Sequence, residues 1–228
     1  MQVLTGFHNQ LTSKWNDMII NLSRSAIRFG HQTIFGGLGS GFDSLTHYPS
    51  LYHNFCWKYK MHFILESLAN NPEQDMVWID ADCLVMRPLD IEAALDGCDV
   101  ALTLRDIADR NATTRPFMDG FINTGVMYFK NGLGAKLFLQ QVIPEMFLSI
   151  FDQDAVNNVL LGEGSKLNKH GEIIKFNNGA KVKILNCREH NNFYFDTTSN
   201  DARILHFKGD MMEKYPAYVS KIRGEVNV

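Results

Sequence analysis

The feature that most constrains this chain is a short apolar run, Met76–Ile79, that ends in the acidic tripeptide Asp80-Ala81-Asp82. Four consecutive apolar residues are typical of a strand buried on both faces, as in a parallel sheet covered by helices. Residues i and i+2 of an extended chain point to the same side, so the two carboxylates converge just beyond the strand. Open α/β sheets bind their ligands at this edge, outside the carboxyl ends of the strands. The run therefore predicts a central strand with an acidic site at its end.

Strand-like and helix-like segments alternate along the rest of the chain, which predicts an α/β fold with a mostly parallel central sheet. The expected strands are 1–5, 33–35, 76–79, 100–104, 126–129, 182–185 and 203–207. The expected helices are 15–26, 55–68, 135–147, 154–161 and 215–223. No repeat or long linker divides the 228 residues, so we expect one domain, residues 1–228.

Composition and charge exclude several classes of protein. Hydrophobic residues make up 45% of the chain, which is too many for a disordered protein, and the net charge of −3 argues against a nucleic-acid binder. No stretch approaches the roughly 18 apolar residues of a membrane helix, and no signal peptide is evident. We expect a soluble, cytoplasmic protein, although a catalytic domain of a lumenal protein would fit the same sequence; the sequence does not specify its oligomeric state. Reduced, buried thiols are expected at Cys56, Cys83, Cys98 and Cys187, which form no CxxC pair.

Four glycines lie within Gly36–Gly41. The segment matches neither a P-loop nor a GxGxxG motif that opens a helix, so a flexible loop is favoured over a phosphate-binding one. Together with the polar stretch Asp106–Asp119, it is a candidate lid that closes over a bound ligand.

The acidic tripeptide favours a divalent cation, because two unneutralised carboxylates would repel each other. Magnesium, manganese and calcium all accept carboxylate oxygens; the alternative is a solvated turn after the strand. His206, at the end of the strand expected at 203–207, would add a nitrogen ligand and shift the preference toward manganese, although such a histidine also suits a protein core. Lys208 and Lys214 are suited to diphosphate oxygens, and Gly209 permits close approach of the backbone.

Five segments, in this order, resemble the core of the GT-A nucleotide-sugar glycosyltransferases, above all family 8 and its relatives: Lys60–Leu68, Met76–Val85, Ile122–Phe129, Phe151–Asn157 and Leu205–Gly209. The resemblance as a whole extends over nearly the whole chain. The resemblance implies a single GT-A domain, which is Rossmann-like, that transfers a sugar from a nucleoside diphosphate sugar. A UDP-sugar is the expected donor, and a hydroxyl of a glycan or another acceptor receives the sugar. The resemblance also implies retention of the anomeric configuration and Mn²⁺ as the cofactor, with Mg²⁺ as the alternative ion.

The resemblance also implies roles for individual residues. The metal ligands are Asp80, Asp82 and His206. The donor-binding residues are Thr5, Lys60, Ala81, Asp106, Asn123, Thr124, Lys208, Gly209 and Lys214. The residues at the reaction centre are Asp152 and Gln153, with Asp154 toward the acceptor.

Two departures from the family pattern concern the donor. The first strand lacks the aspartate that would contact uracil, and the last motif reads Lys214-Tyr215-Pro216 in place of Lys-Pro-Trp. Structural alternatives also remain. Asp152 suits a helix N-cap, and Asn123–Gly125 suits a turn. Lys60 suits a solvated helix face, and Asp106 suits pairing with Arg105, Arg110 or Arg115.

Two other functions compete with sugar transfer. A haloacid-dehalogenase-type phosphohydrolase also places DxD after an apolar strand, with the first Asp as nucleophile, but here about a third of the chain precedes the motif and Cys83-Leu84 follows it. A non-catalytic nucleotide-sugar binding module would use the same metal site. Transferase, phosphohydrolase and binding module are separated by assaying donor hydrolysis with and without manganese.

Overall fold

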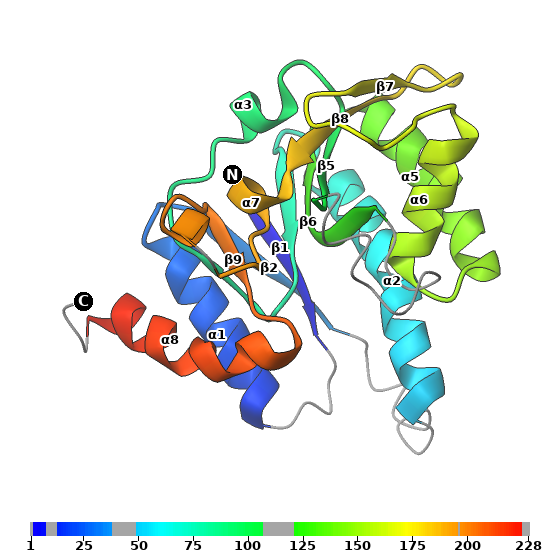
Figure 1. Ribbon diagram of the computed structural model, residues 1–228. Coiled ribbons are helices and arrows are strands. Elements are labelled where there is room, and N and C mark those ends of the chain that lie inside the picture. The colour runs from blue at the N-terminus through cyan, green and yellow to red at the C-terminus, as the bar shows by residue number, and fades with distance from the viewer. Residues whose placement is uncertain (1, 8–12, 38–48, 107–120, 196, 225–228) are drawn as a thin grey trace.

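A seven-stranded sheet forms the centre of the protein (Figure 1). The computed structural model describes residues 2–7, 13–37, 49–106, 121–195 and 197–224. Within these residues the strand order is β2-β1-β3-β6-β5-β8-β7, and all strands but β6 and β7 run in one direction. The sheet is therefore mostly parallel, as predicted. Its strands are β1 (Gln2–Phe7), β2 (Gln32–Gly37), β3 (Met76–Ile79), β5 (Val100–Leu104), β6 (Ile122–Phe129), β7 (Ile173–Lys175) and β8 (Lys181–Asn186).

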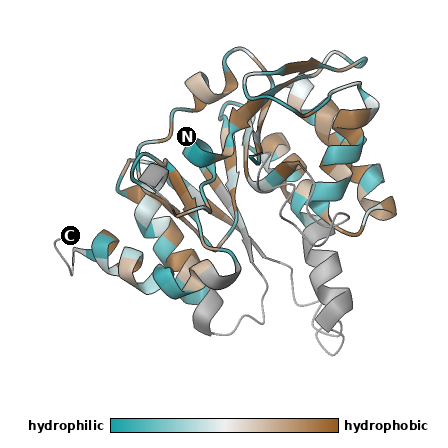
Figure 2. Cartoon of the chain, in the orientation of Figure 1, coloured by the Kyte–Doolittle hydropathy of each residue, from teal (hydrophilic) through white to brown (hydrophobic). Residues whose placement is uncertain are grey.

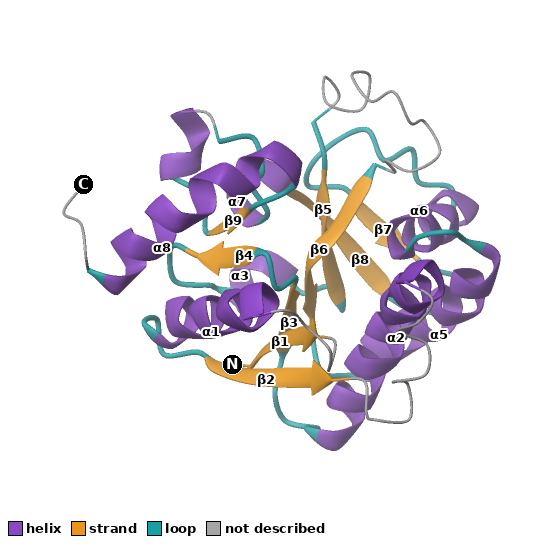
Figure 3. Ribbon diagram, turned by 90° about the horizontal axis from the view of Figure 1, so that it is seen from below, coloured by secondary structure: helices purple, strands orange, loops and turns teal. Residues whose placement is uncertain are grey.

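Helices cover both faces of this sheet, with α2, α5 and α6 on one side and α1 and α3 on the other, while α8 lies beside α1 (Figure 3). Figure 2 shows hydrophobic and hydrophilic stretches side by side on α5 and α6, as expected of helices with one face on a sheet. The helices are α1 (Ser13–Ile27), α2 (Pro49–Asn70), α3 (Ile91–Leu95), α5 (Leu133–Leu148), α6 (Asp152–Gly162), α7 (Cys187–His190) and α8 (Tyr215–Arg223).

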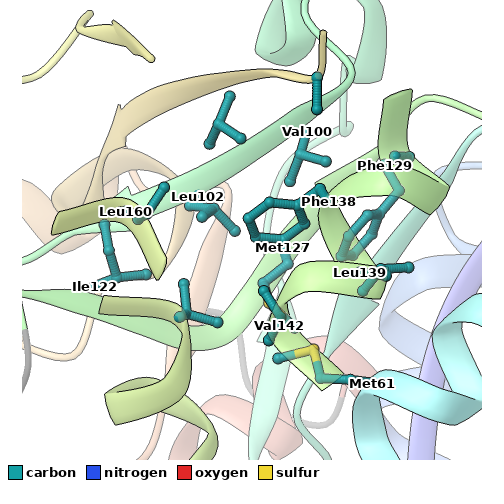
Figure 4. Close-up of a cluster of buried hydrophobic side chains, with 14 of the residues drawn as sticks. Met61, Val100, Leu102, Ile122, Met127, Phe129, Phe138, Leu139, Val142 and Leu160 are labelled. Carbon is teal, nitrogen blue, oxygen red and sulfur yellow. The ribbon is translucent and has the colours of Figure 1, made fainter. Parts of the chain in front are cut away.

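The side chains of β3 explain its continuous apolar sequence. Met76 and Trp78 join the core under α2, α5 and α6, whereas Val77 and Ile79 join the core that includes α1 and α3. The first of these cores is drawn in Figure 4, where Phe138 of α5 lies among residues of β5 and β6. Because both faces of β3 are buried, every one of its positions is apolar.

A second, two-stranded sheet joins distant parts of the chain. Strand β4 (Cys83–Val85) follows the acidic tripeptide and pairs antiparallel with β9 (Ile204–His206), beside which it lies in Figure 3. A core that includes Met18 of α1 and Tyr215 of α8 packs against this sheet. The strand at 203–207 was predicted, but its place outside the central sheet and its partner β4 were not.

Most predicted elements form, and some boundaries differ. The bounds of β3, β5 and α8 are those predicted. Strand β6 begins at Ile122, four residues before its predicted start, so Asn123–Gly125 lie inside a strand and the turn interpretation is wrong. Strand β2 extends through Gly37, so the expected loop begins later; residues 38–41 and 107–119 of the proposed lids lie outside the described residues.

Two chemical expectations concern thiols and membrane helices. Cys83, Cys98 and Cys187 are buried free thiols, as predicted. Across the described ranges, none of the helices combines the length and hydropathy required to span a bilayer.

Candidate functional site at the end of β3

The pairing of β4 with β9 brings His206 to Asp82. Cys83 is the register partner of His206, and the Phe207 amide donates to the Asp82 carbonyl oxygen at 2.9 Å. The imidazole is fully buried, and its Nε2 lies 3.1 Å from Asp82 Oδ1. Burial alone would raise the pKa of Asp82. The neighbouring His206 and Lys208 lower this pKa by more than burial raises it, so the pKa of Asp82 lies below its ordinary value. Asp82 is therefore an ionised carboxylate that faces a buried imidazole.

Gly125 of β6 makes room for this imidazole. A Cβ at residue 125 would lie 2.3 Å from His206 Cε1 and 2.6 Å from Nδ1, closer than any side chain could approach. The carbonyl oxygen of Gly125 accepts from the Asp80 amide at 2.8 Å, which holds the acidic tripeptide against the same point of β6. A glycine is needed here for space, not for a special backbone angle.

Asp82, Cys83 and His206 form a group that could hold a metal ion, with their ligand atoms within 4.8 Å of one another. Burial raises the pKa of the Cys83 thiol well above its ordinary value, and the charges of Asp82 and Asp80 add to this. A neutral thiol is a poor ligand for a hard cation, so Asp82 and His206 are the useful pair. Adjacent ligands of an octahedral ion at about 2.1 Å lie about 3.0 Å apart, close to the observed separation. The two residues therefore fit a hard divalent cation.

Asp80 is not a member of this group and has other partners. Lys60 Nζ of α2 lies 3.0 Å from Asp80 Oδ1 and 2.6 Å from Asp152 Oδ2 of α6, and Trp78 Nε1 donates to Asp80 Oδ1 at 2.8 Å. The ammonium is buried, which lowers the pKa of Lys60, but Asp152 and Asp80 together raise it above its ordinary value. Lys60 is thus a buried cation between two carboxylates rather than a solvated helix residue.

Two buried polar groups near this edge have no hydrogen-bond partner among the described residues. They are Thr5 Oγ1 on β1 and Asn123 Nδ2 on β6, both predicted donor-binding residues. Asn123 Oδ1 accepts from the Gly125 amide at 2.9 Å and lies 3.5 Å from Lys208 Nζ. Buried polar atoms of this kind are uncommon and indicate a site that a ligand completes.

The beginning of α6 holds the three residues predicted at the reaction centre. Asp152 Oδ2 accepts from Thr124 Oγ1 at 2.7 Å in addition to Lys60, and Gln153 Oε1 accepts from Arg105 at 3.0 Å. The N-cap residue is Phe151, so the interpretation of Asp152 as the N-cap is wrong. The Asp154 carboxylate accepts from the Phe151 amide at 3.3 Å, which gives it a capping role.

Other predicted donor residues lie in different surroundings. The carboxylate of Asp106 pairs with Arg188 of α7, not with Arg105, and residues 110 and 115 lie outside the described ranges. Lys214 is exposed and its Nζ lies 5.3 Å from the ring centroid of Phe195. Ala81 is buried between the two aspartates, and Gly209 begins the 3-10 helix Gly209–Lys214 directly after Lys208.

The segment around α7 supplies site residues that sequence reasoning missed. Arg188 binds Asp106, Tyr194 contacts the Asp106 amide, and Asn191 contacts His206. The only sequence signal for this segment is its run of polar residues between two strands, because its partners are distant in the chain.

Comparisons with known proteins give matches in structure only. Neither the protein-family models nor the curated proteins include a match to this sequence. A glycosyltransferase involved in glycosylation of the major capsid of PBCV-1 has a TM-score of 0.61 at 13% identity, over 95% of this chain and 98% of that one. An active-site mutant of LgtC gives 0.56 at 10% identity, over 100% and 97% of the two chains. The fold is that of a GT-A glycosyltransferase.

This fold also appears within a larger protein. The bifunctional glycosyltransferase WbbM matches with a TM-score of 0.53 at 12% identity, over 92% of this chain and 46% of that one. At these identities the likeness establishes the fold, and the expected GT-A fold is confirmed.

Proposed function

We propose that the protein is a metal-dependent glycosyltransferase that moves a sugar from a UDP-sugar to a hydroxyl of a glycan or another acceptor, with retention of configuration. One observation carries this proposal. At the ligand-binding edge of a GT-A fold, a buried imidazole nitrogen lies 3.1 Å from an ionised carboxylate, His206 Nε2 against Asp82 Oδ1. The proposal treats residues 1–228 as one catalytic domain.

The metal site of this proposal contains Asp82 and His206, with Asp80 as the third ligand that the sequence predicts. Mn²⁺, or alternatively Mg²⁺, would supply Lewis-acid stabilisation of the negative charge on the departing diphosphate. Asp80 is bound to Lys60. To act as a ligand, its carboxylate must turn away from Lys60, which leaves that ammonium with Asp152.

The donor would lie across the ends of β1 and β6. Thr5 Oγ1 and Asn123 Nδ2 are unpartnered polar groups suited to donor hydroxyls, and Lys208 beside Asn123 places a cation near the diphosphate. Thr124 and Lys60 act indirectly, because both hold the Asp152 carboxylate in place. Asp106 and Lys214 retain their expected donor roles only if donor binding displaces Arg188 and Phe195.

The reaction centre of the proposal is the start of α6. Asp152 would hold a sugar hydroxyl, and Gln153 would line the face on which positive charge develops at the anomeric carbon. A retaining transfer requires no strong protein base, and a hydroxyl held beside that carbon gains from proximity and orientation. Asp154, which caps α6, is the proposed acceptor contact.

The structure does not favour the phosphohydrolase. In that reaction Asp80 would be the nucleophile, whereas the solved structures that share this fold are glycosyltransferases. A binding module would share the whole site, so activity must decide between binding and transfer.

The proposal is tested by measuring nucleotide release from a panel of nucleotide sugars, beginning with UDP-sugars, with and without Mn²⁺. Asp82→Asn should lower the rate about 100-fold or more, because several kcal/mol of charge stabilisation depend on the ion. Asp201→Asn, which changes an exposed carboxylate paired with Arg87, is the matched control and should be fully active. Equal activity in EDTA, or in folded Asp82→Asn, would overturn the metal-dependent mechanism. Mn²⁺-dependent binding of a nucleotide sugar, seen as a raised melting temperature without turnover, would point to a binding module.

A further inference from the structure

Asn191 lies directly after α7 and is fully buried between three residues of the site. Its side-chain Oδ1 is 2.8 Å from His206 Nδ1. Its Nδ2 donates to Thr103 Oγ1 at 3.0 Å and lies 3.5 Å from the carbonyl oxygen of Asn123. A single amide group therefore connects α7, β5, β6 and β9.

The orientation of this amide follows from its neighbours. Thr103 Oγ1 donates its one proton to the Asn123 carbonyl oxygen at 2.9 Å, so the same hydroxyl must accept from Asn191. The second neighbour, the Asn123 carbonyl oxygen, can only accept. The amide nitrogen of Asn191 must therefore face this pair, and its oxygen faces the imidazole.

The oxygen of Asn191 dictates the tautomer of His206. Because Oδ1 accepts only, the imidazole Nδ1 must carry the proton in this contact. An imidazole that binds an ion through Nε2 is neutral and has a single N–H, which must then be on Nδ1. Its Nε2 lies 3.1 Å from Asp82 Oδ1.

We propose that Asn191 is a positioning residue that fixes His206 in the Nδ1–H tautomer and so presents Nε2 as a ligand atom beside Asp82. The inference rests on the metal site of the proposed function and adds a residue that acts on it only through His206. Gly125 packs against the ring at Cε1 and Nδ1, so the imidazole is held both by a hydrogen bond at Nδ1 and by close packing.

The first test measures Mn²⁺ affinity by electron paramagnetic resonance of the free ion. Asn191→Leu removes both polar atoms but keeps the branching at Cγ, and it should weaken Mn²⁺ binding by about 10- to 100-fold, the usual effect of losing a partner of a ligating histidine. Asn191→Asp keeps an acceptor for Nδ1 but loses the donor to Thr103 and Asn123, so its affinity should lie between those of the wild type and Asn191→Leu. Asn192→Leu is the matched control, because Asn192 is equally buried but its side chain bonds Arg188 and Tyr194 backbone groups. Wild-type affinity in folded Asn191→Leu would overturn the inference.

The second test measures the wild-type protein without metal, so it does not depend on whether a substituted protein folds. The ¹⁵N chemical shifts of the His206 ring in the metal-free wild-type protein report which nitrogen carries a proton, with His206→Gln identifying the signals. A proton on Nδ1 is expected, and a bare Nδ1 with the proton on Nε2 alone would overturn the inference. If wild-type protein binds no Mn²⁺ while Nδ1 carries the proton, the proposed metal site fails and the tautomer assignment stands.

Discussion

At the scale of single residues, the site contains fewer buried cations than carboxylates. Lys60 is one buried cation for two carboxylates, Asp80 and Asp152, which come from different parts of the chain. The acidic tripeptide and Lys60 were both identifiable in the sequence, because they lie in patterned segments. Their pairing was not, since which side chains meet depends on the packing of α2 and α6 against the sheet.

The first prediction concerns this buried cation. Lys60→Met should destabilise the protein by about 3–5 kcal/mol, because it leaves buried carboxylates without their counter-charge. Adding Asp152→Asn should recover part of the loss in stability, since the second change removes one of the buried carboxylates left without a counter-charge. Urea unfolding of the wild type and the three variants of the cycle measures the coupling. Equal losses with and without Asp152→Asn would show that the pair does not interact.

The second prediction concerns the glycine beside His206. Gly125→Ala should cost about 1–3 kcal/mol, as overpacking in a core does, and should remove stabilisation by Mn²⁺ because the imidazole is displaced. Gly162→Ala, at the end of α6 with nothing within 4 Å of the added Cβ, is the control and should be neutral or slightly stabilising. Melting temperatures with and without Mn²⁺ compare the two variants. A metal response retained in Gly125→Ala would argue against ligation by His206.

At the scale of elements, sequence patterns located the strands and helices that local composition determines. Strand β3 was predicted to the residue because burial on both faces leaves it no polar position. Strand β4 was missed because it continues the apolar character of β3 after only three residues, and nothing local shows that it changes sheet. The polar segment at α7 was missed for a related reason, since its role comes from contacts with distant strands.

The third prediction belongs to helix α6. Asp154→Ala should lower the free energy of unfolding by about 1 kcal/mol, because its carboxylate accepts from the Phe151 amide at the helix start. If Asp154 also meets the acceptor, the KM for the acceptor rises in the same variant while the KM for the donor does not. Chemical unfolding and initial rates are measured together. An unchanged acceptor KM would leave Asp154 with the capping role alone.

At the scale of the whole molecule, α7 links the central sheet to the two-stranded sheet through ionisable groups. His190 is buried, its Nδ1 lies 3.0 Å from Tyr128 OH of β6, and its neighbour Glu189 pairs with Arg203. Burial lowers the pKa of His190 to about 4, against an opposing effect of Glu189 and with smaller lowering by Arg203. The folded protein therefore keeps this imidazole neutral where an unfolded chain would protonate it.

The fourth prediction is the resulting pH dependence of stability. Below an unfolded pKa of about 6.5 the unfolded chain binds a proton that the folded one does not, so stability falls as the pH drops from about 6.5 to 4. The contribution is on the order of 3 kcal/mol and is fully present above pH 6.5. In His190→Gln this part of the slope should disappear. Denaturant unfolding across that pH range measures it, and an identical slope in the variant would place the titration elsewhere.

The joining of β4 and β9 has a consequence for how the protein reaches its folded state. Asp82 and His206 are separated by more than half of the chain, so the loop between them must close before their side chains can meet. Closing so long a loop is entropically costly, and contacts of this range are characteristic of late folding steps. An ion held by both residues would bind only chains in which β9 has docked, and mass action would then favour those chains. The ion would thus stabilise the completed fold and not the intermediates in which β9 is still undocked.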